Sequence, residues 1–181
     1  VILANAAPVT HNFCPFIDTN PDAAPDQKYK ALGGNAKTGL IPFVSADGIH
    51  WKKLVDHGVI MKGAFDSQNV SFWSETEKLY VSYFRIFTEK RFRSVSRATS
   101  KDFIHWSEPV EMNYGNTPPE HLYTQQTSPY FRAPHIYVAI GARFLPKRQV
   151  LTDEQAAKLN VNPGYFKDLS DAFFMTTRGG N

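Results

Sequence analysis

Two acidic residues have the spacing and the surroundings that two-carboxylate chemistry needs. Asp66 and Glu120 lie 54 positions apart, and each precedes a short strand-like run that carries aromatic residues. Two carboxyl groups in one concave surface can act as an acid and as a base or nucleophile, which is the arrangement that cleavage of a glycosidic bond requires. If the two groups are crowded, their pKa values are pushed apart and the two roles are separated. Alone, each residue is equally well explained as the cap of a turn.

Further polar side chains occur beside these carboxylates. Arg85 and Arg143 end two strand-like runs, so they return to the same end of the molecule, where they bind substrate oxygens or pair with the carboxylates. His11 and His121 are the two histidines expected at this end of the molecule. Without a neighbouring cysteine they make a weak case for a metal site, and we expect neither a metal nor a cofactor. The other residues that we expect to bind substrate are His11, Asn12, Gln68, Asn69, His121, Tyr123 and Gln125.

An internal repeat shows which elements must position these residues. The run 45–51, Ser-Ala-Asp-Gly-Ile-His-Trp, recurs at 100–106 as Ser-Lys-Asp-Phe-Ile-His-Trp, and a strand-like run precedes each copy at 40–44 and 93–98. The aspartate of each copy is expected to accept backbone N–H groups of a tight turn, and the tryptophan to pack between sheets. His50 and His105 belong to these turns, so we assign them structural roles. Asp18 follows its strand, which places it at the end of the blade opposite to Asp66.

The repeat extends to four strands per unit. Short inner strands are expected at 15–17, 71–73 and 129–131, and longer second strands at 27–32, 78–85 and 135–140. Thr152 and Gln155 form a capping-box pattern that predicts a short inserted helix at 152–159, before a third strand at 170–177. Units of four antiparallel strands at about 10–57, 58–112 and 113–181 predict an all-β fold, a β-propeller with about three blades. Three blades do not close a ring, so we expect residues 1–181 to be one propeller domain that is incomplete at both ends.

The composition narrows the class of protein. The chain of 181 residues is 42% hydrophobic and 14% aromatic, and its formal net charge is +3. No apolar run approaches the ~20 residues that a membrane-spanning helix needs. Cys14 is the single cysteine, which excludes an internal disulfide framework. The densest basic patch, formed by Lys90, Arg91, Arg93 and Arg97, is explained by a solvated strand edge better than by nucleic-acid binding.

Three segments carry a resemblance to known proteins. The runs 12–21, 65–69 and 120–124 look like those of a bacterial group that is similar to the five-bladed propellers of glycoside hydrolase families 32 and 43. The resemblance implies a five-bladed ring in which three carboxylates on separate blades act together on a carbohydrate. It implies that Asp66 is an aspartate of that set and that Glu120 is the general acid, with the remaining carboxylate on a blade upstream of Val1.

Three functions follow from these observations. The first is a glycosidase that acts on a poly- or oligosaccharide, with secretion or a periplasmic location favoured. The second is a non-catalytic glycan-binding propeller, in which Tyr123 and Tyr130 stack on sugar rings. The third is a sialidase-like enzyme, because the repeated turns are close to the Asp-box of sialidases. That enzyme needs three converging arginines, and only Arg85 and Arg143 are well placed.

Overall fold

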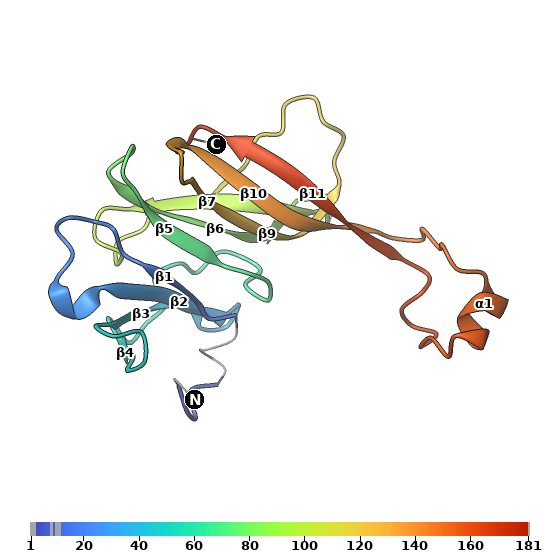
Figure 1. The fold of residues 1–181 in the computed structure, drawn as a ribbon, viewed down its shortest axis with the longest axis horizontal. Coiled ribbons are helices and arrows are strands. Elements are labelled where there is room, and N and C mark those ends of the chain that lie inside the picture. Colours follow the sequence, from blue (N-terminus) through green and yellow to red (C-terminus); the bar gives the residue numbers. More distant parts are fainter. Residues whose placement is uncertain (1–2, 8, 10–11, 181) are drawn as a thin grey trace.

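The chain folds into antiparallel sheets that lie side by side (Figure 1). The computed structural model describes residues 3–7, 9 and 12–180. In this part of the chain the first sheet has the order β1 (Cys14–Ile17), β2 (Tyr29–Asn35), β3 (Gly39–Ser45) and β4 (Lys52–Lys53). The second has the order β5 (Val70–Ser74), β6 (Leu79–Phe87), β7 (Arg93–Ser100) and β8 (Val110–Glu111). The third contains β9 (His121–Tyr130), β10 (Ala133–Leu145) and β11 (Leu169–Thr177), with β10 in the centre.

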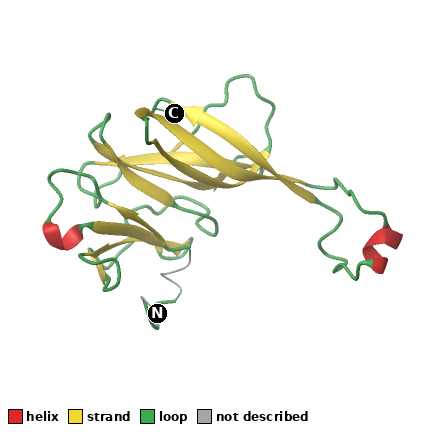
Figure 2. Cartoon of the chain, in the orientation of Figure 1, coloured by secondary structure: helices red, strands yellow, loops and turns green. Residues whose placement is uncertain are grey.

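Each strand pairs with its neighbours in sequence, which is the meander of a propeller blade. The predicted all-β propeller fold is therefore confirmed. Figure 2 shows that the described chain consists of strands and loops apart from α1 (Asp153–Lys158) and the short helical turn η1 (Pro25–Gln27). Neither of these described helices is long and apolar enough to cross a membrane. We refer to the three sheets as blades 1, 2 and 3.

The blades pack face to face through apolar side chains. Leu32 and Leu40 of blade 1 and Phe84 of blade 2 belong to one buried cluster, and each is fully buried. A second cluster joins Tyr83 of blade 2 to Tyr137 of blade 3. Burying a large apolar side chain contributes about 1.5–3 kcal/mol. Contacts between blades, and not only within them, therefore hold the strands that carry the candidate site.

The repeated turns form as predicted. The side-chain oxygen Oδ1 of Asp47 accepts the N–H groups of Ile49 and His50, both at 2.8 Å, and Asp102 repeats this with the corresponding residues at 2.9 and 2.7 Å. The His50 ring also binds the Asp47 carboxylate, and this bond holds the pKa of Asp47 well below its usual range. His50 and His105 have the structural roles expected of them.

One position differs between the two turns. Gly48 has a φ of +75°, in the left-handed region that glycine tolerates. The corresponding residue of the second turn is Phe103, whose φ is +67° although it has a large side chain. Phe103 is fully buried and contacts the rings of Phe16 and Tyr80, with centroids 5.7 and 5.2 Å away. Packing of this ring offsets the strain of its backbone.

Asp18 lies where β1 ends, at the base of blade 1. Its carboxylate is 2.5 Å from the Lys30 ammonium group and accepts a hydrogen bond from the Tyr80 hydroxyl at 2.7 Å. The Asp18 and Lys30 side chains are 0% and 3% exposed. This buried ion pair fixes the base of blade 1 against blade 2, at the end opposite to Asp66.

Blade 3 differs from its prediction at the inner strand. A short strand was expected at 129–131, but β9 runs from His121 to Tyr130 because it pairs with β10 as far as the partners His121 and Phe144. The polar run 124–127 lacks the alternation of apolar residues that marks a strand in a sequence. His121, Tyr123 and Gln125 therefore lie within the inner strand rather than ahead of it.

A long arm leaves blade 3 between β10 and β11. It carries α1 far from the three sheets (Figure 1). The predicted capping box is present, since Thr152 accepts the Gln155 N–H at 3.1 Å and the Gln155 side chain accepts the Thr152 N–H at 2.9 Å. At the base of the arm the Lys147 N–H donates to the Asp168 carboxylate at 2.8 Å. The insertion thus has local structure of its own.

Candidate functional site

The candidate residues gather at one end of the blades, which we call the mouth. There β5 and β9 begin, β6 and β10 end, and β7 and β11 begin, as the antiparallel registers require. Asp66 lies in the loop before β5, and Glu120 directly precedes β9. Two different blades therefore present the two predicted carboxylates at the same end of the molecule.

Asp66 is held by an arginine that also reaches the next blade. Arg85, whose side chain is 5% exposed, forms an ion pair with the Asp66 carboxylate. Its second terminal nitrogen donates to the Tyr123 carbonyl of blade 3 at 3.4 Å. The Asp66 side chain is 66% exposed, so the carboxylate is oriented by a buried partner while one side stays open to a ligand.

Glu120 belongs to a triad that the sequence only partly predicts. Arg143 on β10 binds Glu120 through Nη1 at 2.8 Å. Its Nε and Nη2 bind the two oxygens of Asp171 on β11 at 2.9 and 2.7 Å. This bidentate contact holds the pKa of Asp171 below its usual range and raises that of Arg143.

These contacts revise the expected pairing of carboxylates. Asp66 and Glu120 each pair with an arginine from the second strand of their own blade, and the carboxylate that shares a cation with Glu120 is Asp171. Asp171 is not among the site residues predicted from the sequence. The available signal was its place in the predicted strand 170–177, where the register sets it opposite Arg143.

Tyr123 forms the aromatic part of the mouth. Its side chain is exposed, with 41% of the residue accessible. The guanidinium carbons of Arg85 and Arg93 lie 5.4 and 5.3 Å from the centre of its ring. The two cations hold the ring in place and leave part of it open, which suits stacking against a sugar face.

The basic patch predicted at a solvated strand edge is only partly exposed. Lys90 and Arg91 are exposed in the β6–β7 hairpin, but Arg97 is buried and pairs with Glu77. Arg93 is half-buried at the mouth beside Tyr123. The strand-edge interpretation is wrong for Arg93 and Arg97, because both side chains point into contacts between elements.

The remaining predicted binding residues at the mouth have mixed positions. The His121 ring accepts the Arg93 backbone N–H at 3.2 Å, and burial together with the charge of Arg93 lowers the pKa of His121. Asn12 donates to the Phe65 carbonyl at 3.2 Å and so links blade 1 to blade 2. Gln68 is half-buried near Asp66 in sequence. His11 lies outside the described residues.

Two residues that were predicted to bind substrate are buried, and the prediction is corrected for both. Asn69 is fully buried, and its side chain donates to the Phe65 carbonyl at 3.2 Å. Gln125 is 2% exposed and donates to the Tyr83 carbonyl at 2.9 Å, while its oxygen accepts the Thr127 N–H. Neither side chain has surface left for a sugar. Both satisfy backbone groups, and Gln125 joins blade 3 to blade 2.

Replacement of Gln125 by leucine is expected to lower the free energy of unfolding by about 1–3 kcal/mol, because buried partners lose their hydrogen bonds. Gln126→Leu is the matched control, since Gln126 is the next residue of β9 and its side chain is exposed. Urea denaturation followed by fluorescence measures both. Equal effects of the two substitutions would contradict the role given to Gln125.

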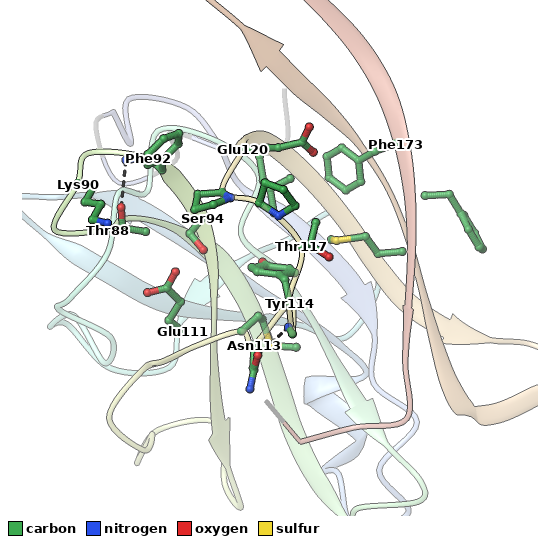
Figure 3. Close-up of a pocket in the computed structure, with 17 residues that line it drawn as sticks. Thr88, Lys90, Phe92, Ser94, Glu111, Asn113, Tyr114, Thr117, Glu120 and Phe173 are labelled. Carbon is green, nitrogen blue, oxygen red and sulfur yellow. Dashed lines mark hydrogen bonds between the residues drawn. The ribbon is translucent and has the colours of Figure 1, made fainter.

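A pocket of about 520 Å³ between blades 2 and 3 reaches Glu120. Figure 3 shows the Glu120 carboxyl group at its rim, near the ring of Phe173. Phe92 and Ser94 come from blade 2, and Tyr114 comes from the loop that connects the two blades. This volume suits a small ligand or part of a larger one. Within the described residues, no group of three or more His, Cys, Asp or Glu could hold a metal ion.

Comparison with known proteins supports the fold. The sequence matches no protein-family model and no curated protein. Among solved structures, an N-acetylgalactosamine deacetylase from F. plautii in complex with blood group B trisaccharide has a TM-score of 0.53 and 12% identity, over 91% of this chain and 49% of that chain. A thermostable family-43 glycoside hydrolase has a TM-score of 0.51 and 8% identity, over 81% of this chain and 46% of that one.

The fold is that of a β-propeller. At such low identities the likeness shows the architecture alone. The chain spans about half the length of these two structures. The five-bladed ring stays a prediction.

Proposed function

We propose that the mouth of this propeller binds a poly- or oligosaccharide and cleaves its glycosidic bonds. The observation that carries the proposal is the placement of Asp66 and Glu120 on separate blades at one mouth, with side chains that are 66% and 37% exposed and an arginine orienting each. The pocket beside Glu120 adds a place for the ligand. The two similar structures are named as a glycoside hydrolase and a deacetylase of an amino sugar, which agrees with a carbohydrate as ligand.

In this mechanism Glu120 donates a proton to the glycosidic oxygen as the bond to the anomeric carbon breaks. Asp66 stabilises the positive charge that develops on the sugar ring. Water then adds to the anomeric carbon and releases a proton, which restores the protonated form of Glu120. Arg143, which lies 2.8 Å from Glu120, stabilises the carboxylate that remains after the proton has been donated. Asp171 binds Arg143 through both of its oxygens, and its role in this mechanism is to position that arginine beside Glu120.

The test is release of reducing sugar by the purified protein on a panel of glycans. Asp66→Asn and Glu120→Gln are each expected to lower kcat/KM by about hundredfold or more, because each removes a group that acts in the transition state. Glu108→Gln is the control, since Glu108 and Lys62 form an exposed pair with side chains 78% and 75% exposed. Full activity in either site variant, with the fold intact, would reject the proposed mechanism.

A second candidate function is glycan binding without catalysis. The observation that favours it is the Tyr123 ring, which is exposed and positioned by Arg85 and Arg93 as a stacking surface. In that case no glycan is cleaved, Tyr123→Ala abolishes binding, and Asp66→Asn and Glu120→Gln retain it. Isothermal titration with the same glycan panel separates the two functions.

A further inference from the structure

Arg93 has an unusual environment at the mouth. It lies on β7 opposite Phe87 of β6, and its guanidinium carbon is 5.1 Å from the ring centre of Phe144 and 5.3 Å from that of Tyr123. The Phe87 ring centre is 5.8 Å away. Its Nε atom is buried and has no hydrogen-bond partner. Aromatic rings from two blades therefore surround this cation without supplying a hydrogen-bond acceptor.

The other arginines near the mouth have carboxylate partners. Arg85 pairs with Asp66, and Arg143 pairs with both Glu120 and Asp171. In the described part of the chain no ion pair is formed by Arg93, nor by Lys90 and Arg91 in the adjacent hairpin. Withdrawing a charge from water is unfavourable unless it is paired, and contacts with aromatic rings offset only part of that cost. An anion is the partner that this position lacks.

Arg85 lies beside Arg93 over the Tyr123 ring and adds positive charge to this part of the mouth. Its residue is 4% exposed, and its Nε is also buried without a partner although its terminal nitrogens are bound. Arg85 and Arg93 both contact Tyr123, so two guanidinium groups lie beside one exposed aromatic ring. Each of the three nitrogens of Arg143 already binds a carboxylate oxygen, so its charge is compensated by Glu120 and Asp171.

We infer that the mouth takes an acidic carbohydrate, in which a carboxylate or a sulfate ester on the sugar binds Arg93 while the sugar ring stacks on Tyr123. The inference rests on the proposed function and names the substrate class of the same site. A guanidinium group presents a planar set of N–H donors that matches two oxygens of one oxyanion. A carboxylate and a sulfate ester are both oxyanions attached to a sugar, and they differ in shape and in the distribution of their charge.

Isothermal titration of the purified protein with three oligosaccharides of matched length tests the inference. One is neutral, one carries uronic acids and one carries sulfate esters. At least one acidic ligand is expected to bind about tenfold to hundredfold more tightly than the neutral one. Arg93→Gln is expected to remove this ratio, and Arg93→Lys to retain part of it. Arg132→Gln is the control, because Arg132 lies 5.3 Å from the Phe131 ring in the β9–β10 turn, at the opposite end of blade 3.

The ratio of acidic to neutral affinity is measured within each variant, so a general loss of folded protein does not imitate the effect. Equal affinity of the original protein for acidic and neutral ligands overturns the inference and leaves the proposed function standing. A preference that survives Arg93→Gln overturns the assignment to Arg93. Absence of binding to every glycan rejects the proposed function and the inference together.

Discussion

Replacing Asp18 by alanine is expected to lower the free energy of unfolding by about 3–5 kcal/mol, because the substitution leaves a buried ammonium group without its counter-ion. Lys30 is 2% exposed, and its other hydrogen bond, to the Gln27 carbonyl, is long at 3.3 Å. Asp18 also accepts the Tyr80 hydroxyl and the Asn20 N–H, at 2.7 and 2.9 Å. One substitution therefore leaves three donors from two blades without their acceptor.

Blade 1 contains a matched control for this substitution. Asp26 and Lys52 form an ion pair at 2.9 Å, but their side chains are 58% and 65% exposed. Asp26→Ala is expected to lower the free energy of unfolding far less than Asp18→Ala, because water solvates both partners of the exposed pair. Urea denaturation of the two variants compares a buried with an exposed acid–lysine pair in one blade. Similar losses of unfolding free energy in the two variants would show that the buried network around Asp18 contributes little to stability.

A double substitution tests the physical reason. Asp18→Asn combined with Lys30→Met removes both charges and keeps an acceptor for the Tyr80 hydroxyl. It is expected to lose less stability than Asp18→Ala alone, because no uncompensated charge remains buried. A double variant that is less stable than Asp18→Ala would show that attraction between the charges, and not the cost of an unpaired one, dominates.

The second large effect is expected at Phe103. Phe103→Ala should cost about 3–5 kcal/mol, since it empties the centre of the core between blades 1 and 2. The backbone at this position is left-handed, and alanine keeps that strain. Glycine relieves it by about 1–2 kcal/mol. Phe103→Gly is therefore expected to be more stable than Phe103→Ala, the reverse of the order usual for these two residues.

The first repeat supplies the comparison for Phe103. Gly48→Ala places a Cβ atom at 3.5 Å from the Tyr29 ring, which is an ordinary contact, so only backbone strain of about 1–2 kcal/mol is expected. Thermal and urea unfolding of Phe103→Ala, Phe103→Gly and Gly48→Ala measure the two contributions at equivalent turn positions. Gly48→Ala reports backbone strain alone, and the Phe103 variants report the loss of packing with and without that strain. The explanation fails if Phe103→Gly unfolds more readily than Phe103→Ala.

Local patterns predicted much of this fold. The alternating run 78–85 became β6, the run 170–177 became β11, and Thr152 with Gln155 capped α1. The aspartates of the repeated turns accept the N–H groups expected of them. In each case the residues that determine the structure lie within a few positions of one another. Local patterns of this kind can be recognised in a short segment of the sequence without knowledge of the rest of the fold.

Contacts between distant residues explain what the sequence analysis missed. Gln125 was interpreted as a ligand contact, but its partner is a carbonyl 42 positions away. Asp171 became part of the site through Arg143, 28 positions away, and Arg97 left the expected exposed patch because Glu77 lies 20 positions away. The type of a polar residue limits the hydrogen bonds and ion pairs that it can form. Only the packing of one blade against another decides which of them it forms.

The arm between β10 and β11 has a consequence for how this protein can diversify. Its two ends meet at the mouth side of blade 3, where Leu145 and Leu169 are paired. The entropy needed to close a loop rises only with the logarithm of its length. Segment 146–168 can therefore be lengthened, shortened or exchanged for another module at small cost to the blade. Surface loops whose ends are held together are the sites where insertions are tolerated. New surfaces can be added next to the mouth at this position while the strands that carry the carboxylates stay unchanged.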